Sequence, residues 1–303
     1  MNKWVKTMAS AALASCILLA GTSAYAASPV YVNGHYQQSI TTPEGKVLVK
    51  LRVLKDPGWL VFAYDSATHT VTAHTKDNSV IVSLREGEKK ALVNGKEVPL
   101  DTAVVNKNGL TYVPLRFLSE TLGLYVHYFA EDNHVIVRTP AGQADYETMM
   151  SGDLTEARKI ALSVDNISTG HKLEPLNVEG WHTTTHIFPV GEALRFSEEM
   201  LGVTSFYRIN EEGLAILTGE QDPDQKGGWG TSQADFGNSY YFIDGFMGGL
   251  LQYGKVDEKW TELGRIYDSS EARYPLVMPI EGEMRKDSVP QPDDTSSSHA
   301  TIK

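Results

Sequence analysis

The run Tyr112-Val113-Pro114-Leu115-Arg116-Phe117-Leu118-Ser119-Glu120-Thr121-Leu122-Gly123 decides the fold of the first part of the chain. Its first two residues favour the end of a strand, and Pro114 suits the first position of a helix, where its missing N–H has no helical partner to lose. Three leucines spaced three and four residues apart then form one apolar stripe. Gly123 fits the left-handed position that ends a helix. The run therefore predicts a strand that leads directly into a short helix.

Arg116 and Glu120 lie four residues apart within this predicted helix, so their side chains can pair. An arginine often packs its aliphatic stem on the protein surface while its charged head stays at the edge. We therefore favour a structural ion pair. The alternative is that Arg116 binds a ligand.

The run belongs to a segment that repeats. Val32-Asn33-Gly34 recurs as Val93-Asn94-Gly95, and Val49-Lys50-Leu51-Arg52 recurs as Val113-Pro114-Leu115-Arg116, at offsets of 61 and 64 residues. Each copy opens with Asn-Gly, a strong signal for a hairpin turn, and continues with a strand, a helix and a closing hairpin. In the first copy, Pro57-Gly58 should cut the helix short. We therefore expect a degenerate tandem repeat of strand-helix-hairpin units.

Residues 29–140 resemble the copper amine oxidase N-terminal-like domain, also called a stalk domain, of exported proteins of Gram-positive bacilli. The resemblance implies a small α+β module that serves for spacing or binding in the cell envelope. It covers the non-catalytic stalk of an amine oxidase and not its copper-bearing domain, so we expect no cofactor and no amine oxidation. The residues that carry the resemblance are Val93-Asn94-Gly95-Lys96, Gly109-Leu110-Thr111-Tyr112-Val113-Pro114-Leu115-Arg116, Glu120-Thr121-Leu122-Gly123 and Asn133-His134-Val135-Ile136-Val137.

Residues 1–26 have the pattern of an export signal. Two lysines precede an apolar stretch at 8–20 that is too short to span a bilayer comfortably, and Ala24-Tyr25-Ala26 is a small-x-small cleavage site. We expect cleavage after Ala26 and a secreted protein that is extracellular or associated with the cell wall. Two alternatives stay open: the stretch is a membrane anchor, or Leu13-Ala14-Ser15-Cys16 is a lipobox whose cysteine is lipidated.

The composition of the mature chain excludes several classes of partner. Cys16 is the only cysteine, so cleavage after residue 26 leaves no disulfide and no cysteine-ligated metal. Of 27 basic residues, loss of Lys3 and Lys6 leaves 25 against 38 acidic residues, a net charge of −13. This charge disfavours nucleic acid and anionic membranes as partners. No later segment approaches about 18 uninterrupted apolar residues, so no transmembrane segment is expected in the mature chain.

The second part of the chain resembles no family that we recognise. Asp153 is expected to cap a helix whose apolar residues follow at helical spacing. From Trp181 onward, β-branched and aromatic residues dominate. They predict one hairpin with its turn at 210–213 and another with a tight turn at Asp244-Gly245.

The predicted organisation is an export signal at 1–26, a stalk-like domain at 27–140, an α+β domain at 141–280 and a tail at 281–303. Pro140-Ala141-Gly142-Gln143 is predicted to be a short link between the domains. The tail is polar and rich in proline and serine, so it is expected to be disordered. The fold class is α+β and predominantly antiparallel β.

The candidate ligand-binding residues lie in the second part, around a glycine-rich loop predicted at 220–237. A loop this long within a compact domain is usually functional or mobile. Trp229 could stack there on a sugar ring, or it could pack back onto the sheet. Asp222 and Asp224 faintly resemble the start of a calcium loop, but the later ligand positions are missing, so we favour an acidic turn. Trp181 is a further aromatic candidate.

The sequence disfavours a metal site and several kinds of catalytic site. His182 and His186 have the spacing of two zinc ligands on a helix, but the three threonines between them favour a strand. On a strand the two histidines would lie roughly 13 Å apart, too far to share one metal. The chain has no nucleophile elbow and no phosphate-binding loop. Paired carboxylates for sugar hydrolysis stay possible, because acidic residues are abundant.

These patterns together predict a non-catalytic protein that is secreted or associated with the cell envelope. It has a stalk-like module and a module that binds an extracellular or cell-wall ligand. A glycan is one candidate for this ligand. The alternative is an extracellular hydrolase that acts on cell-wall or environmental glycans through carboxylates of the second domain. Two buried carboxylates facing each other would favour the hydrolase.

Overall fold

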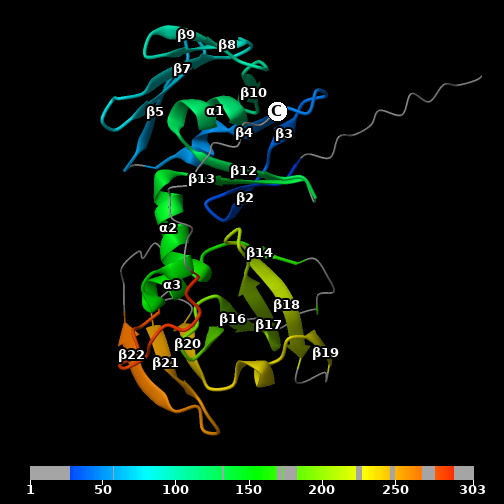
Figure 1. The fold of residues 1–303 in the computed structure, drawn as a ribbon, viewed down its shortest axis with the longest axis vertical. Helices are drawn as coiled ribbons and strands as arrows, with labels where there is room; N and C mark the ends of the chain where they lie inside the picture. Colours follow the sequence, from blue (N-terminus) through cyan, green and yellow to red (C-terminus); the bar gives the residue numbers. More distant parts are fainter. Residues whose placement is uncertain are drawn as a thin grey trace, which may run out of the picture.

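The computed structural model describes residues 28–56, 58–131, 133–168, 173, 183–222, 227–245, 250–267 and 277–289. The expected export signal and its cleavage site lie outside these residues. The described chain is mostly antiparallel β-sheet with three α-helices, which confirms the α+β class (Figure 1).

Three small sheets and two helices make up the first part of the molecule. Their elements are β1 Val30–Val32, β2 His35–Gln37, β3 Ile40–Thr41, β4 Val47–Lys50, the 3-10 helix η1 Leu51–Leu54, β5 Leu60–Asp65, β6 Thr70–Thr75, β7 Ile81–Arg85, β8 Lys90–Val93, β9 Lys96–Pro99, β10 Val105–Lys107, β11 Leu110–Pro114, α1 Leu115–Leu122, β12 Tyr125–Phe129 and β13 His134–Arg138. The sheet orders are β12-β13-β1-β2, β10-β11-β4-β3 and β5-β6-β7-β8-β9.

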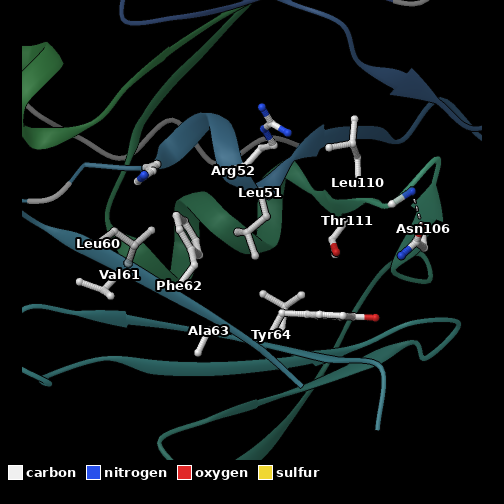
Figure 2. A pocket seen from close by; sticks show the side chains of 13 residues that line it. Leu51, Arg52, Leu60, Val61, Phe62, Ala63, Tyr64, Asn106, Leu110 and Thr111 are labelled. Carbon is white, nitrogen blue, oxygen red and sulfur yellow. Dashed lines mark hydrogen bonds between the residues drawn. The ribbon is translucent and has the colours of Figure 1, made fainter. Parts of the chain in front are cut away.

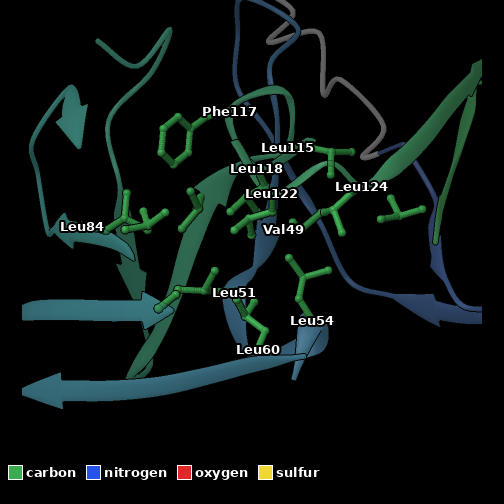
Figure 3. Close-up of a cluster of buried hydrophobic side chains, with 14 of the residues drawn as sticks. Val49, Leu51, Leu54, Leu60, Leu84, Leu115, Phe117, Leu118, Leu122 and Leu124 are labelled. Carbon is green, nitrogen blue, oxygen red and sulfur yellow. The ribbon is translucent and has the colours of Figure 1, made fainter. Parts of the chain in front are cut away.

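The run at 112–123 folds as a strand followed directly by a helix, as predicted. Pro114 still pairs with Leu48 of β4, so it is the N-cap of α1 rather than its first helical residue. Gly123 has φ of 68° and donates its N–H to the carbonyl of Ser119, which closes the helix as expected. The leucine stripe of α1 is buried against η1, β4, β5 and β7 in one hydrophobic core that lies within residues 30–137 (Figure 3).

Both predicted Asn-Gly turns close hairpins. Asn33 and Asn94 have φ of 52° and 50°, and the glycines after them also have positive φ, which is the geometry of a tight primed turn. The first turn joins β1 to β2 and the second joins β8 to β9, and both pairs are antiparallel. The 3-10 helix η1 has four residues, whereas α1 has eight.

One large sheet, two α-helices and one 3-10 helix make up the described residues of the second part. Their elements are α2 Pro140–Ser151, α3 Leu154–Ala161, β14 Asn166–Ile167, β15 Thr184–Pro189, β16 Arg195–Met200, β17 Val203–Ile209, β18 Ala215–Asp222, β19 Gly227–Gly230, the 3-10 helix η2 Gln233–Phe236, β20 Ser239–Gly245, β21 Leu250–Val256 and β22 Glu262–Tyr267. The sheet order is β14-β18-β17-β16-β15-β20-β21-β22, with β19 paired to β18. Side chains of α2 and α3 pack with one face of this sheet in another hydrophobic core. Asp153 caps α3 as predicted, accepting from two backbone N–H groups.

The predicted link at 140–143 is instead the first turn of α2. Thr139 is the N-cap, and its hydroxyl accepts from the N–H of Gly142. Gly142 is buried against the side chain of Asn33, where an added Cβ would overlap the amide oxygen. The prediction of a link was wrong, because proline also fits the first turn of a helix.

The predicted glycine-rich loop at 220–237 is also wrong. β18 continues through Asp222, β19 pairs with it, and η2 follows. A glycine of this segment permits close backbone pairing, because a Cβ at Gly230 would collide with the carbonyl oxygen of Thr218 on β18. The hairpin with its turn at 210–213 is confirmed. The second hairpin exists, but Asp244 and Gly245 pair with β21 as part of β20, so they are not its turn.

The predicted disordered tail is corrected for residues 281–289, which are ordered and packed on the second part. The side chain of Glu283 is buried, and the carboxylate of Asp287 accepts from the backbone N–H groups of Ala193 and Leu194 at 2.7 and 2.6 Å. The polar composition predicts a solvated segment, but these polar side chains instead pair with buried groups. Residues 290–303 lie outside the described chain.

Candidate functional site

A groove of about 690 Å³ opens on the first part of the molecule, between η1, β5 and the turn that joins β10 to β11 (Figure 2). Its volume lies within the range of about 300–1,000 Å³ that is usual for ligand sites. The residues that line it lie between 51 and 111 in the sequence. The groove is thus confined to the first part of the chain, whereas the sequence placed the candidate site in the second part.

The groove runs along the edge of β5 and extends over the face that carries Tyr64 and its neighbour Val71 on β6. Five successive residues, 60–64, line the groove. Successive side chains of a strand point to opposite faces, so a cavity on one face would be lined by alternate residues only. β5 is also an end strand of its sheet, with β6 as its neighbour on the other side.

The hydrogen-bond register of β5 and β6 shows which main-chain groups face the groove edge. The carbonyl of Trp59 accepts from the N–H of Lys76 at 2.8 Å, so residues 59, 61 and 63 bond to β6. The main-chain groups of Leu60, Phe62 and Tyr64 therefore point away from β6. Leu60 fits this assignment, since its N–H donates to the carbonyl of Asp56.

The walls of the groove are largely apolar and accessible. Leu60 is buried in the core of the first part and Phe62 packs against that core. Val61 and Tyr64 are 40% and 55% exposed, which is high for large apolar side chains on a strand. Leu110 of β11 faces the groove from the other side (Figure 2). A ligand with apolar groups would remove this surface from water.

The charged residues that line the groove are both cations. Arg52 and Lys55, in and just after η1, are exposed, and no carboxylate lines the groove. Within the part of the chain that the structure describes, neither side chain makes an ion pair. Asn106 accepts from the N–H of Gly109 and fixes the β10–β11 turn at one end of the groove. The site therefore combines apolar walls with a local positive charge in a chain of net charge −11.

Of the ligand-binding residues predicted from the sequence, the structure describes two. Trp229 lies on β19, half-buried, and packs against the core of the second part, with its indole N–H donating to Glu220 at 3.1 Å. Asp222 is buried at the end of β18. Trp181 and Asp224 lie outside the described residues. Contact of Trp229 or Asp222 with a ligand stays a prediction.

The motif residues at 112–123 lie in β11 and α1 or at the end of α1. Tyr112 and Pro114 are buried in β11, and Gly123 ends α1. Arg116 is half-buried and Glu120 is exposed on α1. The pairing of Arg116 with Glu120 stays a prediction.

A polar row crosses one face of the large sheet. His186, Glu198, Ser205 and Glu220 are paired in register on four successive strands, so their side chains share one face. Burial lowers the pKa of His186 to about 4, and its Nδ1 lies 3.8 Å from the Glu198 carboxylate. Glu220 is fully buried and accepts from Trp229 and from the N–H of Leu173.

Of the two histidines with zinc-ligand spacing, the structure describes one. His186 lies on β15, a strand as predicted, and His182 is outside the described residues. Among the described residues, no group of three or more His, Cys, Asp or Glu side chains is placed to hold a metal ion.

The groove was missed because its walls come from segments far apart in the sequence. One signal was available: the stretch Leu60-Val61-Phe62-Ala63-Tyr64 is apolar throughout, without the alternation of a strand that faces water on one side. Such a run indicates a strand that does not simply have one face in the core and the other in water. Its position at a sheet edge follows only from the three-dimensional pairing.

Comparison with known proteins bears on the first part alone. No curated protein and no solved structure matches the chain. In the described segments, no helix is long and apolar enough to cross a membrane. Residues 31–137, which include every residue that lines the groove, match the family model of the copper amine oxidase N-terminal domain.

Proposed function

We propose that this is an exported, non-catalytic protein of the bacterial cell envelope that binds an extracellular or cell-wall ligand in the groove beside β5. The stalk-like role of residues 27–140 is supported by the family match at 31–137. Export is supported by the basic residues, apolar stretch and cleavage site of residues 1–26. Among the described residues, no cluster of catalytic side chains lines the groove.

The observation that carries the proposal is the groove itself. Its apolar lining and open form suit a ligand that is bound but not enclosed, as in an adhesion or retention module. Its two cations, Arg52 and Lys55, favour a ligand with negative charge. The rest of the negatively charged protein would repel anions, so these two cations would confine an anionic ligand to the groove.

The two-domain organisation and the repeat belong to this proposal. Separate hydrophobic cores at 30–137 and 149–277 support two domains. The order hairpin, strand, helix, hairpin occurs from β1 to β6 and again from β8 to β13, which supports the tandem repeat. In this reading the groove arises because the first copy has only the short η1 beside its hairpin.

The hydrolase alternative has one observation in its favour. Glu198 and Glu220 lie two strands apart on one face of the large sheet, or about 9.5 Å at the usual strand spacing. Inverting glycosidases hold their carboxyl groups about 6.5–9.5 Å apart. Glu220, however, already accepts from Trp229 and Leu173, which gives it a structural role as the anchor of β19.

Purified secreted protein mixed with peptidoglycan sacculi tests both functions. We expect sedimentation with the sacculi, loss of binding in Tyr64→Asp, and full binding in Tyr267→Asp, which changes an exposed tyrosine far from the groove. The supernatant should contain no new sugar ends or free amino groups. Lack of binding by the unmodified protein would contradict the proposal. Release of sugar ends that is abolished in Glu198→Gln would establish the hydrolase instead.

A further inference from the structure

The two edges of the β5-β6-β7-β8-β9 sheet differ in how they are protected. β9 carries Lys96, Glu97 and Pro99, residues that prevent another strand from pairing with an edge. β5 has no proline, and its one charged residue, Asp65, stands at the end of the strand after five apolar residues. An unprotected apolar edge is an aggregation hazard, so its presence in an exported protein indicates that something pairs with it.

The main-chain groups of β5 are positioned for that pairing. The N–H and C=O groups of Phe62 and Tyr64 point away from β6, as the register above shows. They are spaced by two residues, roughly 6.6 Å, which is the repeat of an added strand. A polypeptide matches this alternation of donors and acceptors because its own backbone has the same period. A sugar chain does not.

Charge defines the chemistry of the occupant. Arg52 and Lys55 are exposed beside the groove without ion-pair partners in the described chain, and no acidic residue lines it. A second copy of this chain would bring the same two cations against them when two β5 edges meet. An acidic peptide would instead pair with both cations.

We propose that the groove binds an extended acidic peptide, with apolar residues between its carboxylates, which adds to the free edge of β5 as an extra strand. The peptide backbone pairs with Phe62 and Tyr64. Its apolar side chains contact Val61, Phe62 and Leu110, and its carboxylates lie near Arg52 and Lys55. This inference rests on the proposed binding function of the groove and names its ligand class.

The first test measures the affinity of a blocked octapeptide that alternates valine and glutamate, by calorimetry with the mature protein. The double variant Arg52→Ser/Lys55→Ser should weaken binding about tenfold, since each exposed pair is worth up to about 1 kcal/mol and 1.4 kcal/mol is a factor of ten. The double variant Arg208→Ser/Lys259→Ser removes the same charge from exposed positions in the second part of the chain and should bind normally. Equal loss in both variants, or equal binding of a lysine-for-glutamate peptide, would overturn the charge argument.

The second test separates strand addition from mere contact with the tyrosine ring. Tyr64→Ala removes the ring, and Tyr64→Pro removes the ring and the outward N–H without breaking a bond to β6. Tyr64→Pro should bind the octapeptide more weakly than Tyr64→Ala. Hydrogen exchange should show new protection at the amides of Phe62 and Tyr64, while those of Val61 and Ala63 are protected with or without peptide.

The outcomes distinguish this inference from the proposed function. Sacculi retained through the groove without octapeptide binding would leave the binding function standing and refute the peptide. Octapeptide binding without new protection at the amides of Phe62 and Tyr64 would also leave the binding function standing, but it would refute strand addition. A dimer in sedimentation that is lost in Tyr64→Pro would assign the edge to a second copy and also refute the peptide.

Discussion

The guanidinium of Arg158 and the carboxylate of Glu283 form a two-point ion pair, with Nη1–Oε2 and Nη2–Oε1 distances of 2.8 and 2.7 Å, although 125 residues separate them. Their side chains are 1% and 2% exposed. Further bonds satisfy both groups: Arg158 donates to the carbonyls of Pro189 and Glu192, and Glu283 accepts from the N–H of Gly191. The pair thus joins α3, the turn after β15 and the C-terminal segment 277–289.

Glu283→Gln should destabilise the protein by about 3–5 kcal/mol, because it leaves the Arg158 charge buried without its counter-charge. Urea unfolding followed by fluorescence measures this free energy. Glu281→Gln changes an exposed carboxyl in the same segment and serves as the matched control. A loss no larger than that of the control would show that the ion pair is not formed in solution.

Removal of residues 282–303 should destabilise the protein at least as much as Glu283→Gln. It deletes Arg285, whose guanidinium donates to the carbonyls of Met149, Met150 and Gly152 at the end of α2, as well as Asp287. These carbonyls have no helical partners and would lose their donor. Removal of residues 290–303 deletes none of these contacts and is the control. Equal urea midpoints for the two truncations would contradict the packing of 282–289.

Local signals in the sequence predicted local structure well. Pro114, the leucine stripe and Gly123 act within one helix, and Asp153 acts within one turn, so short-range rules suffice. The order of the C-terminal segment was not predicted because it depends on the ion pair between Glu283 and Arg158, and these residues are distant in sequence. The groove was missed for the same reason, since an edge strand is defined by pairing and not by its own residues. The prediction of a loop at 220–237 was wrong because glycine is compatible both with turns and with close contact between strands.

The stability of the protein should depend on pH through His186. Burial lowers the pKa of His186 from 6.5 to about 4, so the unfolded chain binds a proton that the folded chain rejects between these values. This contribution is fully present above pH 6.5 and is lost as the pH falls toward 4, by roughly 3 kcal/mol. Glu198 opposes the shift, but at 3.8 Å it is beyond hydrogen-bond reach, so burial dominates.

Urea unfolding at several pH values tests this contribution. His186→Leu cannot take up the proton and should flatten the dependence on pH between about 4 and 6.5. His127→Leu makes the same change at an exposed histidine and is the matched control. If the slopes of the protein and of His186→Leu coincide, another group causes the loss of stability.

Gly142→Ala should destabilise the joint between α2 and the β1–β2 turn by about 1–3 kcal/mol, the usual cost of overpacking. The new Cβ would overlap the side-chain amide of Asn33, which also bonds the backbone and hydroxyl of Thr139. A double-mutant cycle with Asn33→Gly measures the coupling, because glycine keeps the positive φ of this position and removes the obstructing amide. In the Asn33→Gly background the alanine should cost little. Purely additive effects would contradict the clash.

Residues 27–140 expressed alone should fold cooperatively. Among the strands that the structure describes, each of those from β1 to β13 pairs only within this part, and its hydrophobic core is complete there. A self-contained core and closed hydrogen-bonding pattern are what allow a segment to fold by itself.

The fragment should nevertheless be less stable than the same part of the whole protein. It loses the bond between His134 and Glu212 at 2.8 Å, the donation from Arg138 to the carbonyl of Glu212, and the stacking of Arg138 on Tyr146. Arg138 would then keep its cation–π contact with Tyr125 and lose the one with Tyr146. Urea unfolding of the fragment and of the mature chain compares the two. A single cooperative transition with a lower midpoint, together with undiminished binding of the octapeptide, is the expected result. A fragment without any cooperative transition would show that the two parts share one folding unit, because the joint and not the internal core would then determine stability.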